Sequence, residues 1–286
     1  MTAENKKLNI GIVGLGLIGG SLAAALKNSG YTVFGSDTNK ITLDFAKMAG
    51  SIDGELTDES ISSCDVIFVA ITLDQAEAWI NSKAHLISKD CVLVDCCGVK
   101  RRICARGKEL SEACGFKFLG GHPMAGKQVG GYKNSRADLF KDATFCLVPM
   151  DKNDIRLLTS IKDILADIGF TRFIVMTAEE HDRVIAFTSQ LAHLVSNAYI
   201  KSDIAEAEEV SALSGGAFRD MTRVAYLDEA MWTELFMENS DNLLSELDGF
   251  IGELERYREA IENKDGDALT KLLVEGKERK RTIEEK

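Results

Sequence analysis

The chain has 286 residues, enough for about two domains that each bury a core of their own. Its composition of 45% hydrophobic and 28% charged residues is typical of folded globular proteins and excludes wholesale disorder. Residues 1–176 carry 21 basic and 20 acidic side chains, whereas residues 177–286 carry 13 basic and 25 acidic ones. The acidic second half argues against a nucleic-acid partner, because phosphate binding requires a basic surface.

The stretch from Leu8 to Leu26 carries no charge and follows two lysines, as in a signal peptide or a short membrane span. Its five glycines weaken an isolated helix but suit a strand, a tight turn and a helix start. No other uncharged run approaches the length of about eighteen residues that suggests a membrane span. We therefore expect a soluble, unprocessed, cytoplasmic protein with no membrane partner.

Short apolar runs alternate with helical patterns through residues 1–176, which predicts a parallel sheet with crossover helices. The expected strands are Leu8–Val13, Thr32–Ser36, Asp65–Ile71, Cys91–Asp95, Phe116–Gly120, Thr144–Val148 and Arg172–Met176. The expected helices between them are Ile18–Ser29, Asn39–Ala49, Lys100–Cys114 and Asn153–Ile168.

Residues 177–286 contain no further strand pattern and are expected to form an all-helical domain packed against the first. This domain opens with a capping box at Thr177 and Glu180, and apolar residues then recur at helical spacing to about Ile200. The further helices are expected at Glu206–Leu213, Met231–Asn263 and Ala268–Glu284. Their wide apolar stripes exceed what one small bundle hides, which predicts a homodimer.

The sequence Gly14, Leu15, Gly16, Leu17, Ile18, Gly19 is a G-x-G-x-x-G motif between an expected strand and an expected helix. In such a motif the glycines allow a tight turn, close approach of a pyrophosphate and close packing of helix on strand. Asp37 follows the second strand, where a carboxylate binds ribose hydroxyls and repels a 2′-phosphate. The motif and Asp37 thus predict NAD as cofactor. The alternative for the motif is a glycine-rich turn that binds nothing, and the alternative for Asp37 is that it only caps the next helix.

His122 lies between glycines and Pro123, directly after the strand expected at Phe116–Gly120. Its imidazole should leave the carboxyl edge of the sheet, where ligands bind in open α/β folds. A lone loop histidine is most often a hydrogen-bonded surface residue, but beside a dinucleotide site the role of general base is the better hypothesis.

Seven cysteines lie within residues 64–146, and no two of them form a CxxC pair. Because their number is odd, a complete set of disulfides is excluded and reduced core thiols are expected. An iron–sulfur or zinc site in the cluster Cys91, Cys96, Cys97 and Cys104 is the alternative. The four histidines form no HxH or HExxH pair, so we expect no metal.

Two further histidines and two arginines of the helical half are candidate binding groups. His181 and His193 are twelve residues apart on one expected helix, so they should not easily touch the same small substrate. Either could instead bridge helices. Arg219 and Arg223 follow a glycine-led turn, and their guanidinium groups could bind a carboxylate or form surface ion pairs.

The chain resembles the prephenate dehydrogenase family of tyrosine biosynthesis over nearly its whole length. The resemblance rests on GLGLIGGS near the start, DCCGVK at 95–100, GGHPMAGKQVGGY at 120–132, HDRVIAFTSQLAH at 181–193 and GGAFRDMTRVA at 215–225. It implies a Rossmann-like parallel-sheet domain (residues 1–176) that binds NAD and an all-helical substrate and dimerisation domain (residues 177–286). The implied reaction is NAD-dependent oxidative decarboxylation of prephenate to 4-hydroxyphenylpyruvate and CO2.

The resemblance also implies roles for single residues. His122 matches the catalytic histidine that accepts the proton of the ring hydroxyl, and His193 matches a histidine of the substrate pocket. Arg223 matches the arginine that binds a prephenate carboxylate, with Arg219 as the second candidate. His181 matches another histidine near the active site, whose role is less defined.

Two positions depart from the family pattern. Gly98 stands where many members have a serine that supports the histidine and the substrate hydroxyl, so that hydrogen bond must come from elsewhere or from water. Gln128, expected at the substrate entrance, stands where many members have glutamate, which argues against a charge-dependent gate there.

Three alternative functions remain. An arogenate or dual-specificity (cyclohexadienyl) dehydrogenase is the nearest. A β-hydroxyacid dehydrogenase is disfavoured by the segment GGHPMAG, and a non-catalytic NAD-responsive binding protein is more distant.

Overall fold

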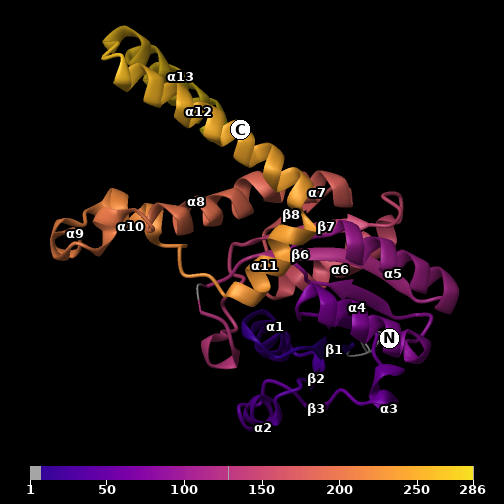
Figure 1. The fold of residues 1–286 in the computed structure, drawn as a ribbon. Helices are drawn as coiled ribbons and strands as arrows, with labels where there is room; N and C mark the ends of the chain where they lie inside the picture. The colour runs from indigo at the N-terminus through magenta and orange to yellow at the C-terminus, as the bar shows by residue number, and fades with distance from the viewer. Residues whose placement is uncertain (1–7, 128, 286) are drawn as a thin grey trace.

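The computed structural model describes residues 8–127 and 129–285, and a single sheet organises its first half (Figure 1). The strands are β1 (Asn9–Val13), β2 (Thr32–Ser36), β3 (Gly54–Glu55), β4 (Val66–Val69), β5 (Val92–Asp95), β6 (Lys117–Met124), β7 (Thr144–Pro149) and β8 (Arg172–Val175). Their order in the sheet is β3-β2-β1-β4-β5-β6-β7-β8. Neighbouring strands run parallel except β6 and β7, which are antiparallel.

Helices cover both faces of the sheet and enclose two apolar clusters. These helices are α1 (Leu17–Asn28), α2 (Lys40–Met48), α3 (Asp58–Ile61), α4 (Leu73–Lys83), α5 (Arg101–Cys114) and α6 (Ile155–Asp167). Phe68 and Val94 face the cluster beneath α1 and α6, whereas Ile67 and Leu93 face the cluster beneath α4 and α5. Alternate residues of the central strands are thus buried on both faces, which confirms the predicted Rossmann-like architecture.

The second half is helical, as expected. Its helices are α7 (Ala178–Ile185), a π-helical segment (Ala186–Leu191), α8 (Ala192–Tyr199), α9 (Glu208–Leu213), α10 (Gly216–Thr222), α11 (Glu229–Glu238), α12 (Ser240–Glu262) and α13 (Gly266–Glu284). A short 3₁₀ turn, Asp203–Glu206, lies between α8 and α9, and two more lie in the described part of the first half. In Figure 1, α8 to α10 extend to one side, and the paired α12 and α13 project away from the sheet. Within the described part of the chain, no helix has the length and apolar character needed to cross a bilayer.

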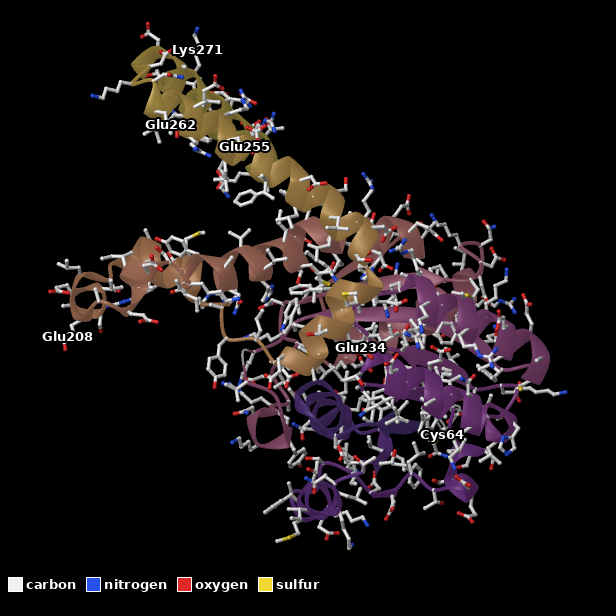
Figure 2. The ribbon with its side chains drawn as sticks, in the orientation of Figure 1. Cys64, Glu208, Glu234, Glu255, Glu262 and Lys271 are labelled. Atoms are coloured by element: carbon white, nitrogen blue, oxygen red, sulfur yellow. The ribbon has the colours of Figure 1, made fainter. Side chains whose placement is uncertain are left out.

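Helix α11 returns from the helical half and lies against the first half. The Glu234 carboxylate, labelled in Figure 2, accepts hydrogen bonds from the backbone N–H of Leu73 at 3.2 Å and of Asp74 at 2.7 Å. These N–H groups belong to the first turn of α4, which has no side-chain cap of its own. A carboxylate is favoured there because the helix start carries unpaired donors and partial positive charge. The contact therefore joins the two halves.

The observed elements differ from the expected ones in several places. Strand β6 continues past Gly120 to Met124, because β7 pairs with this segment in antiparallel register. The expected helix Met231–Asn263 is divided at Asn239, whose buried side-chain amide donates to the backbone oxygen of Asp182 in α7 and to the side-chain oxygen of Gln190 in the π-helical segment. Helix α4 was not expected. By contrast, the capping box of α7 is confirmed, with reciprocal bonds between Thr177 and Glu180.

Candidate active site

The glycine motif forms a tight turn between β1 and α1. Gly14 has φ of +83°, and a Cβ atom there would lie 2.7 Å from the carbonyl oxygen of Ala70. A Cβ atom at Gly19 would lie 1.8 Å from the carbonyl oxygen of Gly14. At Gly16 the same position is open, and the start of α1 has no side-chain cap. This turn fits a pyrophosphate, because the open backbone and the unpaired N–H groups at the helix start favour an anion.

The remaining motif residues support this turn. Leu15 is buried and its N–H donates to the Asp37 carboxylate at 2.8 Å, while Leu17 and Ile18 begin α1. Asp37, which directly follows β2, also accepts from the N–H of Asn39 at 2.8 Å.

Asp37 does not cap α2, so the capping interpretation of this residue is wrong. The capping residue is Asn39, whose side-chain oxygen accepts from the N–H of Ile41 at 3.0 Å. A carboxylate has about four acceptor positions, so Asp37 retains capacity for a ligand hydroxyl beside the glycine turn.

His122 lies in strand β6 and not in a loop after it, contrary to expectation. Strand β6 pairs with β5 only as far as Leu119, so His122 lies just beyond the carboxyl end of β5. This is the edge at which the glycine turn and Asp37 also lie. The Nδ1 atom of His122 is 2.9 Å from Nε2 of His181, and Nδ1 of His181 is 2.8 Å from the Asp182 carboxylate.

This chain of three side chains fixes the tautomers of both histidines. A carboxylate only accepts hydrogen bonds, so the proton of His181 is on Nδ1 and its Nε2 is an acceptor. His122 must then donate from Nδ1, which leaves a lone pair on its Nε2. Burial, the neighbouring His181 and the charge of Lys100 together hold the pKa of His122 well below its usual value, so the imidazole is neutral at neutral pH.

Both ring nitrogens of His181 are hydrogen-bonded to protein, and the side chain is 1% exposed. This geometry favours a role in orienting His122 over the substrate contact expected from the sequence. Burial also lowers the pKa of His181, which outweighs the hydrogen bond to Asp182. Both rings are therefore neutral, and the proton on Nδ1 of His122 forms the hydrogen bond between them.

Asp182 links the histidine pair to the first half of the molecule. Its Oδ1 also accepts from the N–H of Lys100 at 2.7 Å, and its Oδ2 accepts from the N–H of Arg101 at 2.9 Å. Although burial raises the pKa of Asp182, the hydrogen bond from His181 and these N–H groups lower it overall. Asp182 was not predicted as a site residue; its position next to a histidine was the available signal in the sequence.

His193 and Arg223 form a second group, with Trp232 of α11. His193 donates from Nδ1 to the carbonyl oxygen of Ser189 at 2.8 Å, and its ring stacks on Trp232 with centroids 4.1 Å apart. Burial lowers the pKa of His193, the bond to Ser189 opposes this, and the charge of Arg223 lowers it further. The neutral ring thus presents Nε2 as an acceptor. Trp232 was missed because a lone tryptophan in an apolar helix pattern is typical of a core residue.

The backbone around Arg223 is held against α8 by two side chains. Ser196 donates to the carbonyl oxygen of Met221 at 2.7 Å, and Asn197 donates to that of Ala225 at 3.0 Å. Arg219 lies one turn earlier on α10. Both arginines are exposed, and among the described residues neither guanidinium has an ion-pair partner. The influence of Arg223 on His193 distinguishes it as the arginine of this group.

The two departures from the family pattern have different outcomes. A Cβ atom at Gly98 would lie 2.9 Å from Cδ2 of Leu235, so a leucine of α11 packs over the position at which a serine was considered. The hydrogen bond to His122 comes from His181. Gln128 lies outside the described residues.

Comparison with known proteins agrees with this arrangement. A prephenate dehydrogenase nucleotide-binding domain model matches residues 22–175, and a prephenate dehydrogenase dimerization domain model matches residues 177–275. A cyclohexadienyl dehydrogenase of Zymomonas mobilis is 30% identical over 277 residues, which are 93% of each chain.

Two solved structures share the whole fold. Prephenate dehydrogenase from A. aeolicus, in complex with hydroxyphenyl propionate and NAD+, has a TM-score of 0.84 and 29% identity, covering 98% of this chain and 99% of that one. Synechocystis arogenate dehydrogenase has a TM-score of 0.81 and 25% identity, covering 96% and 100%. With both domain models matched in order along the chain, this protein belongs to the prephenate dehydrogenase family.

Proposed function

We propose that the protein catalyses NAD-dependent oxidative decarboxylation of prephenate to 4-hydroxyphenylpyruvate and CO2. The observation that carries this proposal is the hydrogen-bonded chain from Asp182 through His181 to His122. It leaves an unprotonated nitrogen at the sheet edge that also holds the glycine turn. A positioned neutral imidazole is the general base that removal of a hydroxyl proton requires.

NAD as cofactor is supported by two features of the structure and by two comparisons. The glycine turn of residues 14–19 fits a pyrophosphate, and Asp37 stands where a ribose hydroxyl would bind and a 2′-phosphate would be repelled. The matched nucleotide-binding domain and the NAD+ held by the A. aeolicus enzyme agree with this choice. When bound, NAD supplies the acceptor for the hydride.

The residues of this chain would act on the substrate in a defined order. Arg223 binds a substrate carboxylate through charge-assisted hydrogen bonds, which orients the ring. His122 accepts the proton of the ring hydroxyl on Nε2, while His181 and Asp182 hold the imidazole in the required tautomer. The imidazolium that forms is stabilised by the Asp182 carboxylate through His181. Carbon dioxide then leaves as the substrate ring becomes aromatic.

The protein should act as a homodimer. The chain matches the family's dimerization domain, and the projecting helices α12 and α13 expose apolar side chains. Leu254 is 51% exposed, Ile261 62% and Leu273 59%. A second copy of the chain would cover such surface, since monomeric soluble proteins seldom expose large apolar patches.

An arogenate or dual-specificity dehydrogenase is the second candidate. It is favoured by the 30% identity to a cyclohexadienyl dehydrogenase and by the fold shared with an arogenate dehydrogenase. These activities differ only in whether the substrate side chain carries a keto or an amino group. A non-catalytic binding protein is less well supported, because it has no need of the oriented histidine pair.

Turnover measurements distinguish these candidates. NADH or NADPH formation would be followed with purified protein, using prephenate or arogenate and NAD or NADP in all four combinations. We expect the highest kcat/KM with prephenate and NAD. Higher kcat/KM with arogenate would overturn the substrate assignment, equal values for the two dinucleotides would overturn the role of Asp37, and no turnover in any combination would overturn the enzymatic proposal.

A further inference from the structure

Lys100 carries a buried positive charge directly before α5. Its side chain is fully buried, and its ammonium group donates to the equally buried carboxylate of Asp95 at the end of β5. Replacing a buried ion pair by apolar residues is often neutral or stabilising, so such a pair is weak evidence for a purely stabilising role. Its position therefore suggests that it serves the adjacent site.

Asp95 reaches the backbone that carries His122. Its Oδ2 accepts from the N–H of Gly121 at 3.2 Å, and its Oδ1 accepts from the N–H of Cys97 at 3.0 Å. A Cβ atom at Gly121 would lie 2.6 Å from the carbonyl oxygen of Asp95, which shows how closely the two strands approach. The pair thus holds β6 at the residue preceding the proposed base.

The charges around His122 come from four elements. The titratable groups of these elements that belong to its network or pair with it in the sheet are His181 and Asp182 on α7, Lys100 before α5, Asp95 on β5 and Cys146, the register partner on β7. Burial raises the pKa of Cys146 to about 11, so this thiol stays neutral. Burial lowers the pKa of Lys100 but Asp95 raises it above its usual value, so the lysine stays charged. Its charge lowers the pKa of both His122 and His181, in addition to burial.

We propose that Lys100 is a positioning residue for His122: together with Asp95 it fixes strand β6 at the residue preceding the imidazole, and it adds a buried positive charge to the network that holds both histidines. This inference rests on the proposed role of His122 as general base. It assigns to Lys100 no contact with the substrate.

The test uses opposite charge changes in the intact protein. In Lys100→Met the Asp95 carboxylate is left uncompensated, so His122 should titrate at higher pH by about one unit. In Asp95→Asn the lysine charge remains alone, so His122 should titrate at lower pH. The double variant Asp95→Asn/Lys100→Met and the charge-conserving Lys100→Arg should titrate close to the unaltered protein.

Two readouts follow these shifts. Histidine ring signals in NMR report the titration without turnover, and His122→Asn assigns the His122 signal among the four histidines. The acid limb of kcat/KM for prephenate should move in the same direction. Lys108→Met, on an exposed residue of the same helix, is the matched control and should leave both readouts unchanged.

The outcomes separate this inference from the proposed function. A merely structural pair would not give shifts of opposite sign, so unchanged His122 titration in folded Lys100→Met and Asp95→Asn would overturn the inference. If Lys100→Met does not fold, the other two variants test the inference. A lower titration pH of His122 in Asp95→Asn, with a value near that of the unaltered protein in the double variant, would support it, and no difference between these variants would overturn it. Shifts seen by NMR in a protein that does not turn over prephenate would refute the proposed function and leave the electrostatic role standing.

Discussion

The nucleotide-binding half and the helical half of this molecule bury their apolar side chains to different extents. The first half places two apolar clusters on opposite faces of its sheet, with central side chains such as Phe68 and Ile67 fully buried. In the helical half, Leu243 and Leu272 are buried, but Ile261 and Leu273 are more than half exposed. The first half therefore contains its own core, while the second half presents a surface that a partner would complete.

The two halves also differ in the chemistry that they contribute. The first half carries the glycine turn and His122, for which we propose roles in binding the dinucleotide and in accepting the proton. The second half carries Arg223 and His193, which are suited to holding the substrate. A change at His122 should therefore alter mainly kcat, and a change at Arg223 should alter mainly the KM for the substrate.

The largest effect is expected for His122→Asn. Removing a positioned base should lower kcat by about 10²–10⁴-fold, because the hydroxyl proton then has no acceptor. NAD affinity should stay unchanged, since the imidazole is not part of the glycine turn. Steady-state kinetics with prephenate and fluorescence titration with NADH would measure both quantities. A variant with kcat near that of the unaltered enzyme would contradict the assignment.

Arg223→Ala should act mainly on substrate binding. Losing a charge-assisted hydrogen bond costs about 1.5–3 kcal/mol, which corresponds to a roughly ten- to hundredfold rise in the KM for prephenate if ground and transition states are affected equally. The KM for NAD should remain close to its original value. Arg219→Ala is the control, and circular dichroism would verify the fold. Should Arg219→Ala abolish binding while Arg223→Ala does not, the two arginines are assigned in the wrong order.

Leu273→Asp should weaken the association of two chains. Replacing the leucine by a carboxylate removes apolar burial at the interface and places there a charge without a partner. The dissociation constant of the dimer should therefore rise by about tenfold or more. Met48→Asp, at an 82% exposed position of the nucleotide-binding half, is the matched control and should leave association intact. Light scattering over a dilution series measures the effect. A monomer of the unaltered chain at working concentration would show that α12 and α13 need no partner.

A smaller effect concerns acid stability. Because the pKa values of His122 and His181 are lowered in the folded state, the unfolded chain binds more protons below its histidine pKa of about 6.5. The free energy of unfolding should therefore fall as the pH decreases below about 6.5, while kcat/KM stays on its plateau until the lower folded-state pKa of His122 is reached. Urea unfolding between about pH 7 and pH 5 tests this, and a flat profile would count against neutral buried histidines.

The sequence predicted most strands because each is a short apolar run with turn residues on both sides, as at Thr32–Ser36. It did not predict the extension of β6 to Met124, because glycine and proline disfavour a strand and pairing with β7 overrides that preference. The break at Asn239 likewise depends on distant partners, since its amide binds oxygens of another helix. Tertiary contacts of this kind leave no local pattern.

The candidate site shows the same limit. His122 could be found because its flanking glycines and its place after a strand are local features. The partnership of His122 with His181 could not, since 59 residues separate them and the contact depends on how the two halves pack. The spacing predicted that His181 and His193 should not easily touch the same small substrate, but it did not indicate their neighbours, which are His122 and Asp182 for one and Ser189 and Trp232 for the other.

Asp182 also bears on whether the domains could exist apart. The same carboxylate that orients His181 binds the backbone of Lys100 and Arg101 at the start of α5. A fragment ending at residue 176 would keep the glycine turn and His122 but would lack the partner that sets the tautomer of that histidine. Exchange of the helical half between related enzymes would therefore succeed only where the incoming helix supplies both an equivalent histidine and an equivalent carboxylate. Recombination of these domains is thus constrained by which nitrogen of His122 carries the proton, as well as by the packing of the two halves.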